Sequence, residues 1–217
     1  MNWLVNTTGG LAVRIALGVA VFAVLAILDL RRHGRQARRW REYLFLVFTV
    51  AVAMAYGVTN DMITSTISWE YFYHGKGLEE VLGPDVPPAG GALWWQAAKV
   101  GMMATWTVGL LLGAAVLIAN NPRKRSSPLP FATLYKLALA PLACAAVLGA
   151  LLGLAGGLGG LNWLDADLRL MWQEDLWRPA RFTAVWGVHL GGYLGGAIGA
   201  VAAVVYILLR RRYNPLR

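Results

Sequence analysis

Five long runs of apolar residues, each separated from the next by a short polar or charged segment, dominate the sequence. They cover residues 11–30, 43–60, 93–119, 134–160 and 182–209. A run of about 20 apolar residues is long enough to cross the hydrocarbon core of a bilayer as a helix. A helix also satisfies its own backbone hydrogen bonds there. The runs therefore predict an all-α, polytopic membrane protein, in which residues 1–217 form a single bundle of five transmembrane helices.

The composition agrees with this fold class. Hydrophobic residues make up 58% of the chain and charged residues only 14%, whereas charged residues make up about a quarter of a soluble domain. A signal peptide is the competing interpretation of the first run. However, no Lys or Arg precedes Arg14, and Arg31 and Arg32 follow the run directly, so we expect a retained span. The single cysteine, Cys144, lies inside an apolar run and should behave as a small hydrophobic residue.

The basic residues set the expected orientation. The net charge is +9, but the arginines and lysines cluster within 31–41, within 123–125 and after 209. This distribution is typical of membrane orientation, so we expect no nucleic-acid partner. Because cytoplasmic loops carry the excess of basic residues, we expect a bacterial inner-membrane protein with its N-terminus outside and its C-terminus in the cytoplasm. The cytoplasmic arginines would face the lipid bilayer and its anionic headgroups.

Two polar segments are expected on the outer side. The first is an outer loop over 61–92, in which the alternating β-branched residues of 63–67 predict an extended stretch. The second lies near 163–178, where apolar residues recur every three to four positions. This spacing predicts an amphipathic helix that lies on the membrane surface.

Glycines recur at every fourth position in the last two runs. They are Gly149, Gly153 and Gly157 in the fourth run and Gly187, Gly191, Gly195 and Gly199 in the fifth. Small residues at this spacing let helix backbones approach closely in lipid, where no hydrophobic drive pairs the helices. We therefore expect these faces to pack against each other or against a partner, either another membrane protein or a second copy. The alternative is a broken helix at 156–160, as in transporters, which the absence of an internal repeat disfavours.

Polar side chains near the outer boundary form the candidate site. They are Asp61, Glu70, Tyr71, Lys99, Trp106, His189 and Tyr193. His189 and Tyr193 are four positions apart and share one helix face. An ionisable group inside a membrane span is a candidate for function, and carboxylates with an imidazole bind divalent metals or pass protons.

A structural network is the competing interpretation of these residues. In that network Asp61 would cap a helix end and His189 would bond to a neighbouring helix. Glu70 would pair with Lys99 or Arg181. The residue spacing matches no specific metal motif, so neither a metal nor a cofactor is assigned, and Asp61, Glu70 and His189 remain weak metal candidates.

Four short segments, in chain order, also carry a resemblance. They are Asn60-Asp61, Glu70-Tyr71-Phe72, Ala104-Thr105-Trp106 and His189-Leu190-Gly191-Gly192-Tyr193. They resemble a family of bacterial multi-span membrane proteins that carry H-D-Q-[IV]-[ST], x-E-Y-F, A-T-W-W-x-G and H-x-x-x-Y motifs and have no assigned reaction. Asn60 and Met62 stand where the family has His and Gln. The resemblance implies a membrane topology and a set of positions, but no mechanism.

These observations favour a structural or accessory membrane component without its own turnover. It would use its glycine faces and outer loops to contact a partner. The first alternative is an outward-facing enzyme whose metal or acid/base site is built on Asp61, Glu70 and His189 and lined by the other candidate residues. The second alternative is a small transporter with Lys99 and His189 on its path. The inner halves of the runs hold almost no polar residues, which disfavours a pore through one chain.

Overall fold

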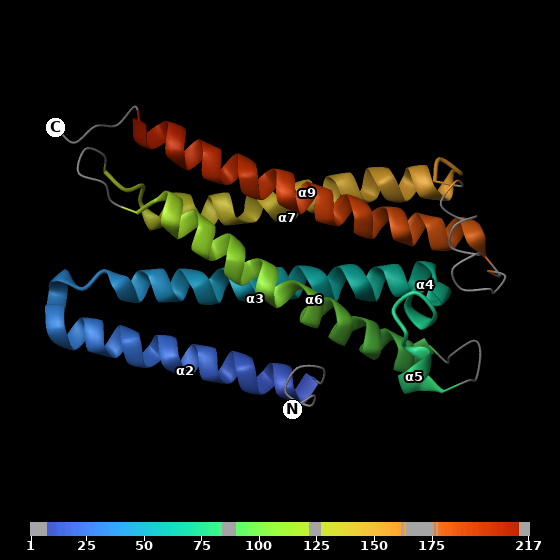
Figure 1. Cartoon of the computed structure of the whole chain (residues 1–217), viewed down its shortest axis with the longest axis horizontal. Coiled ribbons are helices and arrows are strands. Elements are labelled where there is room, and N and C mark those ends of the chain that lie inside the picture. Colours follow the sequence, from blue (N-terminus) through green and yellow to red (C-terminus); the bar gives the residue numbers. More distant parts are fainter. Residues whose placement is uncertain are drawn as a thin grey trace. The chain divides into compact units, whose positions relative to one another are not determined.

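The computed structural model describes residues 8–83, 90–121, 127–161, 163, 176 and 178–212. Within these residues the secondary structure is helical, without a strand. Five of the helices are long and apolar enough to cross a membrane (Figure 1). They are α2 (Thr8–His33), α3 (Arg39–Ile67), α6 (Gly90–Ala119), α7 (Phe131–Gly157) and α9 (Pro179–Arg212). The prediction of an all-α, polytopic membrane fold is therefore confirmed.

The second span is longer than the sequence predicts. Helix α3 continues past Asn60 and Asp61 to Ile67, so the prediction of an extended stretch over 63–67 is wrong. In this stretch the Thr64 hydroxyl donates to the Asn60 carbonyl at 2.8 Å, and the Ser65 hydroxyl donates to the Met62 carbonyl at 2.9 Å. Because these hydroxyls bond back along the same helix, the polar and β-branched residues remain helical at the end of the span.

The predicted outer loop 61–92 is also partly helical. Ser68 separates α3 from the short helix α4 (Trp69–Tyr73), and its hydroxyl accepts a hydrogen bond from the Tyr71 main-chain N–H at 3.3 Å. Such an N-cap satisfies one of the free N–H groups of the first turn. A second short helix, α5 (Glu79–Leu82), precedes α6. The predicted amphipathic helix near 163–178 lies almost entirely outside the described residues.

The chain divides into two compact units, which are described separately. The first unit contains Met1–Ala55, Met102–Ala138 and Val204–Arg217, and the second contains Tyr56–Gly101 and Leu139–Ala203. Helices α3, α6, α7 and α9 each contribute one stretch to both units, whereas α2 belongs to the first alone.

The core of the first unit gathers the starts of α3 and α7 with the ends of α6 and α9. Phe45, Val116, Leu134 and Ile207 are fully buried there, one from each helix. At the same end the Arg211 guanidinium donates to the Ala119 carbonyl at 2.6 Å, so it satisfies a free carbonyl at the last turn of α6. The basic ends of the helices therefore belong to one unit.

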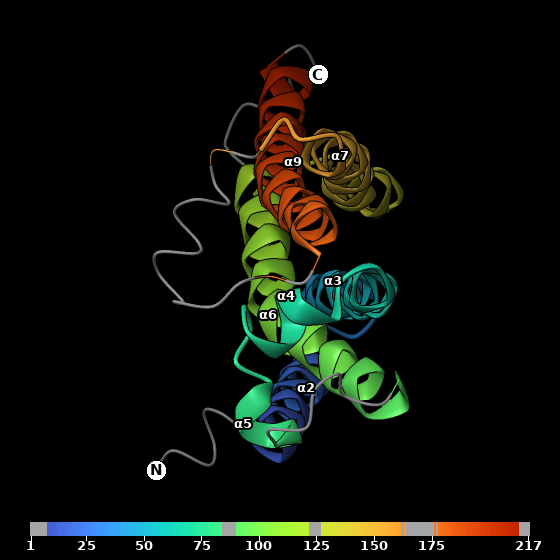
Figure 2. The ribbon, with the colours of Figure 1, turned by 90° about the vertical axis from the view of Figure 1, so that its right-hand side faces the viewer.

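In the second unit, α7 and α9 run antiparallel with their backbones in contact, and they lie side by side in both views (Figures 1 and 2). The contacts pair a glycine of α9 with a carbonyl of α7: Gly187 with Leu152, Gly191 with Leu148, and Gly195 with Cys144. A methyl group on any of these three glycines would lie 2.2–2.3 Å from that carbonyl oxygen. The glycine faces of the two helices therefore pack against each other within one chain.

At the end of α7, the glycine that contacts α9 is not the one that the four-residue spacing predicts. Gly156, rather than the predicted Gly157, makes the close contact, because a methyl group on Gly156 would lie 2.2 Å from the Thr183 carbonyl oxygen. A methyl group on Gly157 would meet only the Ala184 methyl, at an ordinary 3.5 Å. Beyond it, Gly159 has a φ of 90° and the Gly160 N–H donates to the Ala155 carbonyl at 2.7 Å. Residues 156–160 therefore form a C-terminal cap rather than a break within a span.

Glycines of α6 also pack closely, although they do not recur at every fourth position as those of α7 and α9 do. A methyl group on Gly101 would lie 2.2 Å from the Gly57 carbonyl oxygen, in the second unit. A methyl group on Gly109 would lie 2.5 Å from the Thr49 carbonyl oxygen, in the first. Helices α3 and α6 thus approach each other as closely as α7 and α9 do.

Candidate functional site

Helices α3 and α9 bring Asp61 and His189 together in the second unit. The Asp61 Oδ1 and His189 Nε2 atoms are 3.8 Å apart, and both side chains are more than nine-tenths buried. The Thr64 hydroxyl lies 3.5 Å from the same His189 nitrogen, and the Asn60 amide donates to Asp61 Oδ1 at 3.2 Å. The two residues form a carboxylate–imidazole pair with additional polar neighbours, as a buried charged group requires.

The sequence suggested that Asp61 caps a helix end, but it does not. It lies inside α3, nearly two turns before the helix ends at Ile67. Gly101 of α6 packs beside it, where a methyl group would lie 3.0 Å from the Asp61 carboxyl carbon. The glycine therefore lets α6 approach the helix face that carries the carboxylate.

Aromatic rings cover the imidazole. The Tyr71 ring stacks on His189, with the ring centroids 4.7 Å apart and the planes inclined by 19°. The Phe72 ring meets His189 edge-on, with the centroids 5.9 Å apart. Tyr71 also packs against Phe182 and Trp186 of α9. Helix α4 thus lies over the His189 side chain, because its own buried aromatics pack against the start of α9.

The Tyr71 side chain that stacks on His189 carries no charge. Burial raises the pKa of the Tyr71 phenol well above its ordinary value, and the nearby Tyr193 and Asp61 raise it further. The Lys76 ammonium lies 5.4 Å from the centroid of the Tyr71 ring, a cation–π contact. The phenol therefore stays protonated around neutral pH.

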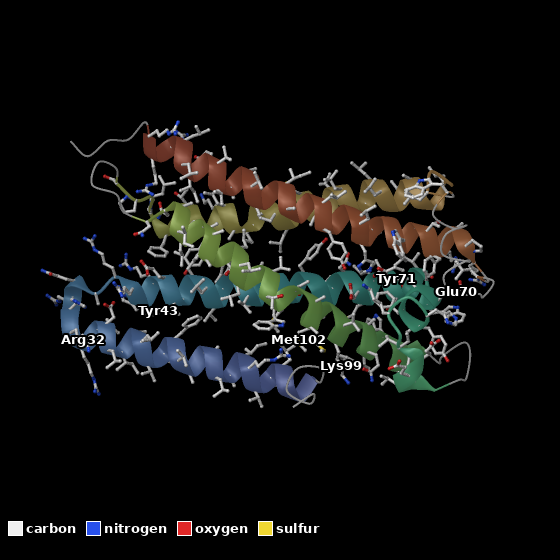
Figure 3. The ribbon with its side chains drawn as sticks, viewed as in Figure 1. Arg32, Tyr43, Glu70, Tyr71, Lys99 and Met102 are labelled. Carbon is white, nitrogen blue, oxygen red and sulfur yellow. The ribbon has the colours of Figure 1, made fainter. Side chains whose placement is uncertain are left out.

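Glu70 has a structural contact. Its side chain is buried, and Oε2 accepts a hydrogen bond from the Arg178 main-chain N–H at 3.1 Å. This bond joins α4 to the residue just before α9. Figure 3 shows Glu70 beside Tyr71 at α4, with Lys99 apart from both of them on α6.

The proposed metal triad is not assembled. Among the residues that the structure describes, no three His, Cys, Asp or Glu side chains come close enough together to hold a metal ion. Asp61 and His189 meet, but Glu70 does not join them. In the described part of the chain, Glu70 bonds to the main chain of Arg178 instead of joining the pair, so a metal site built on all three residues stays a prediction without support from this geometry.

Trp106 and Tyr193 are two further candidates from the sequence. Trp106 belongs to the first unit, where the Arg14 guanidinium lies 5.4 Å from the centroid of its ring. Tyr193 is 61% exposed, and its ring centroid is 6.4 Å from that of His189. Sharing a helix face with His189 therefore does not bury Tyr193 beside it.

A cavity of about 420 Å³ lies at the end of the second unit that holds α4. We call it the outer cavity. It is lined by Ser65, Thr66, Ile67, Ser68, Trp69, Glu70, Gly91, Leu93, Trp94, Arg178 and Arg181. Asp61 and His189 are not among these residues. Glu70 and Arg181 are candidates that the sequence suggests, whereas Arg178 and Ser68 are not. The signal for Arg178 was its place three residues before Arg181, at the end of an acidic segment.

Comparisons of the chain with protein-family models, with curated proteins and with solved structures give no match. The resemblance to the family of bacterial membrane proteins therefore stays a prediction. The geometry offers two separate features: a closed carboxylate–imidazole pair and a cavity with charged walls.

Proposed function

We propose that this protein is a structural or accessory component of a bacterial cytoplasmic membrane, which acts by contacting a protein partner rather than by catalytic turnover. The closed Asp61–His189 pair carries the proposal. A general acid or base must come within hydrogen-bond reach of its substrate. Asp61 and His189 are only 5% and 6% exposed, they are covered by Tyr71, and they do not line the outer cavity. Such a pair is better suited to holding α3 and α9 together, which we call a clamp, than to catalysing a reaction on a substrate.

The proposed orientation places the N-terminus outside and the C-terminus in the cytoplasm. Its support is the distribution of charge between the two units. The last turns of α2 and α9 carry arginines and belong to the first unit. Helix α5, with Glu79 and Glu80 in its first turn, belongs to the second. The excess of arginine is typical of the cytoplasmic side.

The proposed partner surface is α5. The glycine faces of α7 and α9 contact each other, so they do not provide this surface. Helix α5 lies outside the spans and exposes Glu79, Glu80 and the apolar Val81, which is 62% exposed. An exposed apolar residue beside two carboxylates suits a partner segment that carries an apolar side chain and a basic residue.

The test is crosslinking in native cells, with a photoreactive amino acid at position 81. We expect a discrete crosslinked species, and loss of the co-purifying protein in the variant Val81→Asp. Leu158, which is 86% exposed in the turn after α7, provides the matched control. Leu158→Asp should leave the partner bound. A well-expressed protein that is always alone and monomeric would contradict the proposal.

An acid/base site is the second candidate, because the Asp61 carboxylate and the His189 imidazole are only 3.8 Å apart. A clamp and a reactive site respond differently to His189→Gln. A reactive site loses its cellular role while the free energy of unfolding stays close to that of the parent protein. If the pair is a clamp, the protein loses its cellular role only in proportion to the stability that it loses. Complementation of a deletion strain measures the cellular role, and an unfolding titration of the same variant measures the stability.

A further inference from the structure

We propose that the outer cavity binds the headgroup of an anionic phospholipid, with its phosphodiester against Arg178 and Arg181. This site is separate from the predicted lipid contacts of the cytoplasmic arginines, and it does not depend on the proposed protein partner. Four observations carry it: the place of the cavity along the helices, its charge, its free hydroxyl donor and its apolar wall.

The cavity lies at the level where lipid headgroups lie. Its walls come from the last residues of α3, from α4, and from the first residues of α6 and α9. Because these are ends of spans, they lie at the boundary between hydrocarbon and water. Trp69 and Trp94 stand in the walls, as tryptophans do at membrane interfaces.

The charge of the cavity favours an anion. Among the described residues that line it, two are arginines and one is a glutamate. The carboxylate of Glu70 is buried and accepts a bond from the Arg178 main chain, whereas the Arg178 and Arg181 side chains are exposed. The Arg181 main-chain N–H donates to the Arg178 carbonyl at 3.0 Å, and its guanidinium makes no hydrogen bond or ion pair with another residue in the described part of the chain. A guanidinium binds a phosphodiester through two parallel N–H bonds, so this pair suits a lipid phosphate.

The hydroxyl groups that line the cavity offer a lipid headgroup one hydrogen-bond donor and several acceptors. Ser68 is 2% exposed, and its oxygen accepts the Tyr71 N–H. Its own O–H bonds to no other described residue, so it is left to donate to a phosphate oxygen. The Ser65 and Thr66 hydroxyls already donate to main-chain carbonyls, and their oxygens can still accept. A headgroup that carries both a phosphodiester and hydroxyl groups, such as phosphatidylglycerol, matches this set.

The remaining wall is apolar. Ile67, Leu93 and Trp94 line it, next to the polar side chains. A volume of about 420 Å³ falls within the range of about 300–1,000 Å³ that is typical of small-molecule sites. An apolar wall beside a phosphate site suits an amphiphile better than a free phosphate, which would leave that wall in contact with water.

The test uses the full chain in nanodiscs of phosphatidylcholine that contain a trace of phosphatidylglycerol with a diazirine in its headgroup. After irradiation, peptide mapping locates the label. We expect labelling within 65–70 and 91–94. Unlabelled phosphatidylglycerol should compete, whereas extra phosphatidylcholine and soluble glycerol phosphate should not.

The variants make the assignment specific. Arg178→Gln together with Arg181→Gln should reduce labelling of these peptides by about tenfold or more, because one charge-assisted hydrogen bond is worth about one factor of ten in affinity. Arg181→Lys, which keeps the charge but not the planar fork, should retain part of it. Arg212→Gln, at the opposite end of α9, is the matched control and should leave the labelling unchanged. Thermal unfolding followed by circular dichroism shows whether each variant is folded.

Three results would overturn the proposal. Equal labelling in the folded double variant would mean that the arginines do not hold the headgroup. Equal competition by phosphatidylcholine would mean that the cavity does not select an anion. Competition by soluble glycerol phosphate at the same concentration as by the lipid would assign the site to a small phosphate instead of a phospholipid.

Discussion

The glycine contact between α7 and α9 leads to a quantitative prediction for Gly191→Ala. The new methyl group would lie 2.2 Å from the Leu148 carbonyl oxygen, while an ordinary contact begins near 3.4 Å. The helices must therefore part by about 1 Å at this point. The backbone contacts at Gly187 and Gly195, one turn to either side, must open with it.

The expected cost follows from two opposing effects. Overpacking of a close contact costs about 1–3 kcal/mol, and replacement of glycine by alanine within a helix returns about 0.5–1 kcal/mol. The contact is with rigid backbone, so the clash is the larger effect, and we expect Gly191→Ala to lower the free energy of unfolding by up to about 2.5 kcal/mol. Gly196, on the same helix, has no atom within 4 Å of the place where its methyl group would stand. Gly196→Ala should therefore leave the free energy of unfolding unchanged or raise it by up to about 1 kcal/mol.

The assay is reversible unfolding in mixed micelles, followed by far-ultraviolet circular dichroism as the denaturing detergent fraction rises. The parent protein, Gly191→Ala and Gly196→Ala are compared at the same protein concentration. The reasoning is refuted if Gly191→Ala unfolds at the same detergent fraction as Gly196→Ala, since the two variants differ only in whether the added methyl group meets the backbone of α7.

Three further predictions concern polar groups. Asn120→Ala removes the two hydrogen bonds between the Asn120 amide and the Leu129 main chain, at 3.0 and 2.8 Å, so the free energy of unfolding should fall by about 1–3 kcal/mol in the same micelle assay. Tyr71 contributes stability that is fully present below about pH 10 and is lost as the pH rises toward its raised folded-state pKa. A decline in unfolding free energy above about pH 10 should therefore be smaller in Tyr71→Phe, and an equal decline in both proteins would contradict this assignment. For the buried pair, a double-mutant cycle of Asp61→Asn and His189→Gln should give a coupling energy of about 0.5–3 kcal/mol, whereas additive effects would show that the two side chains do not interact.

The apolar runs predicted the spans because length and hydropathy are local properties of the chain. The end of α3 was harder to predict, since alternating β-branched residues favour a strand in water. In the protein the hydroxyls of Thr64 and Ser65 bond back to carbonyls of their own helix. A sequence pattern alone does not show where those hydroxyls find their acceptors.

The candidate site was predictable only in part. Burial in a span marked His189, but its contact with Asp61 depends on the rotation of α3 and α9 about their own axes. The partner of Glu70 is a main-chain N–H of Arg178, and a main-chain donor has no sequence signature. Similarly, Gly156 rather than Gly157 faces Thr183, since one residue turns a helix face by about 100°.

The position of Tyr71 over His189 has a kinetic consequence. Helix α4 is only five residues long, and it is connected to α3 through the single residue Ser68. Protons and chemical reagents that approach the His189 imidazole from the side of Tyr71 therefore reach it only while α4 has moved away from the ring. The rate of histidine modification and the rate of amide exchange in α4 would then report the same opening event. On that side, access to a side chain buried in a span depends on the stability of a short helix that follows the span.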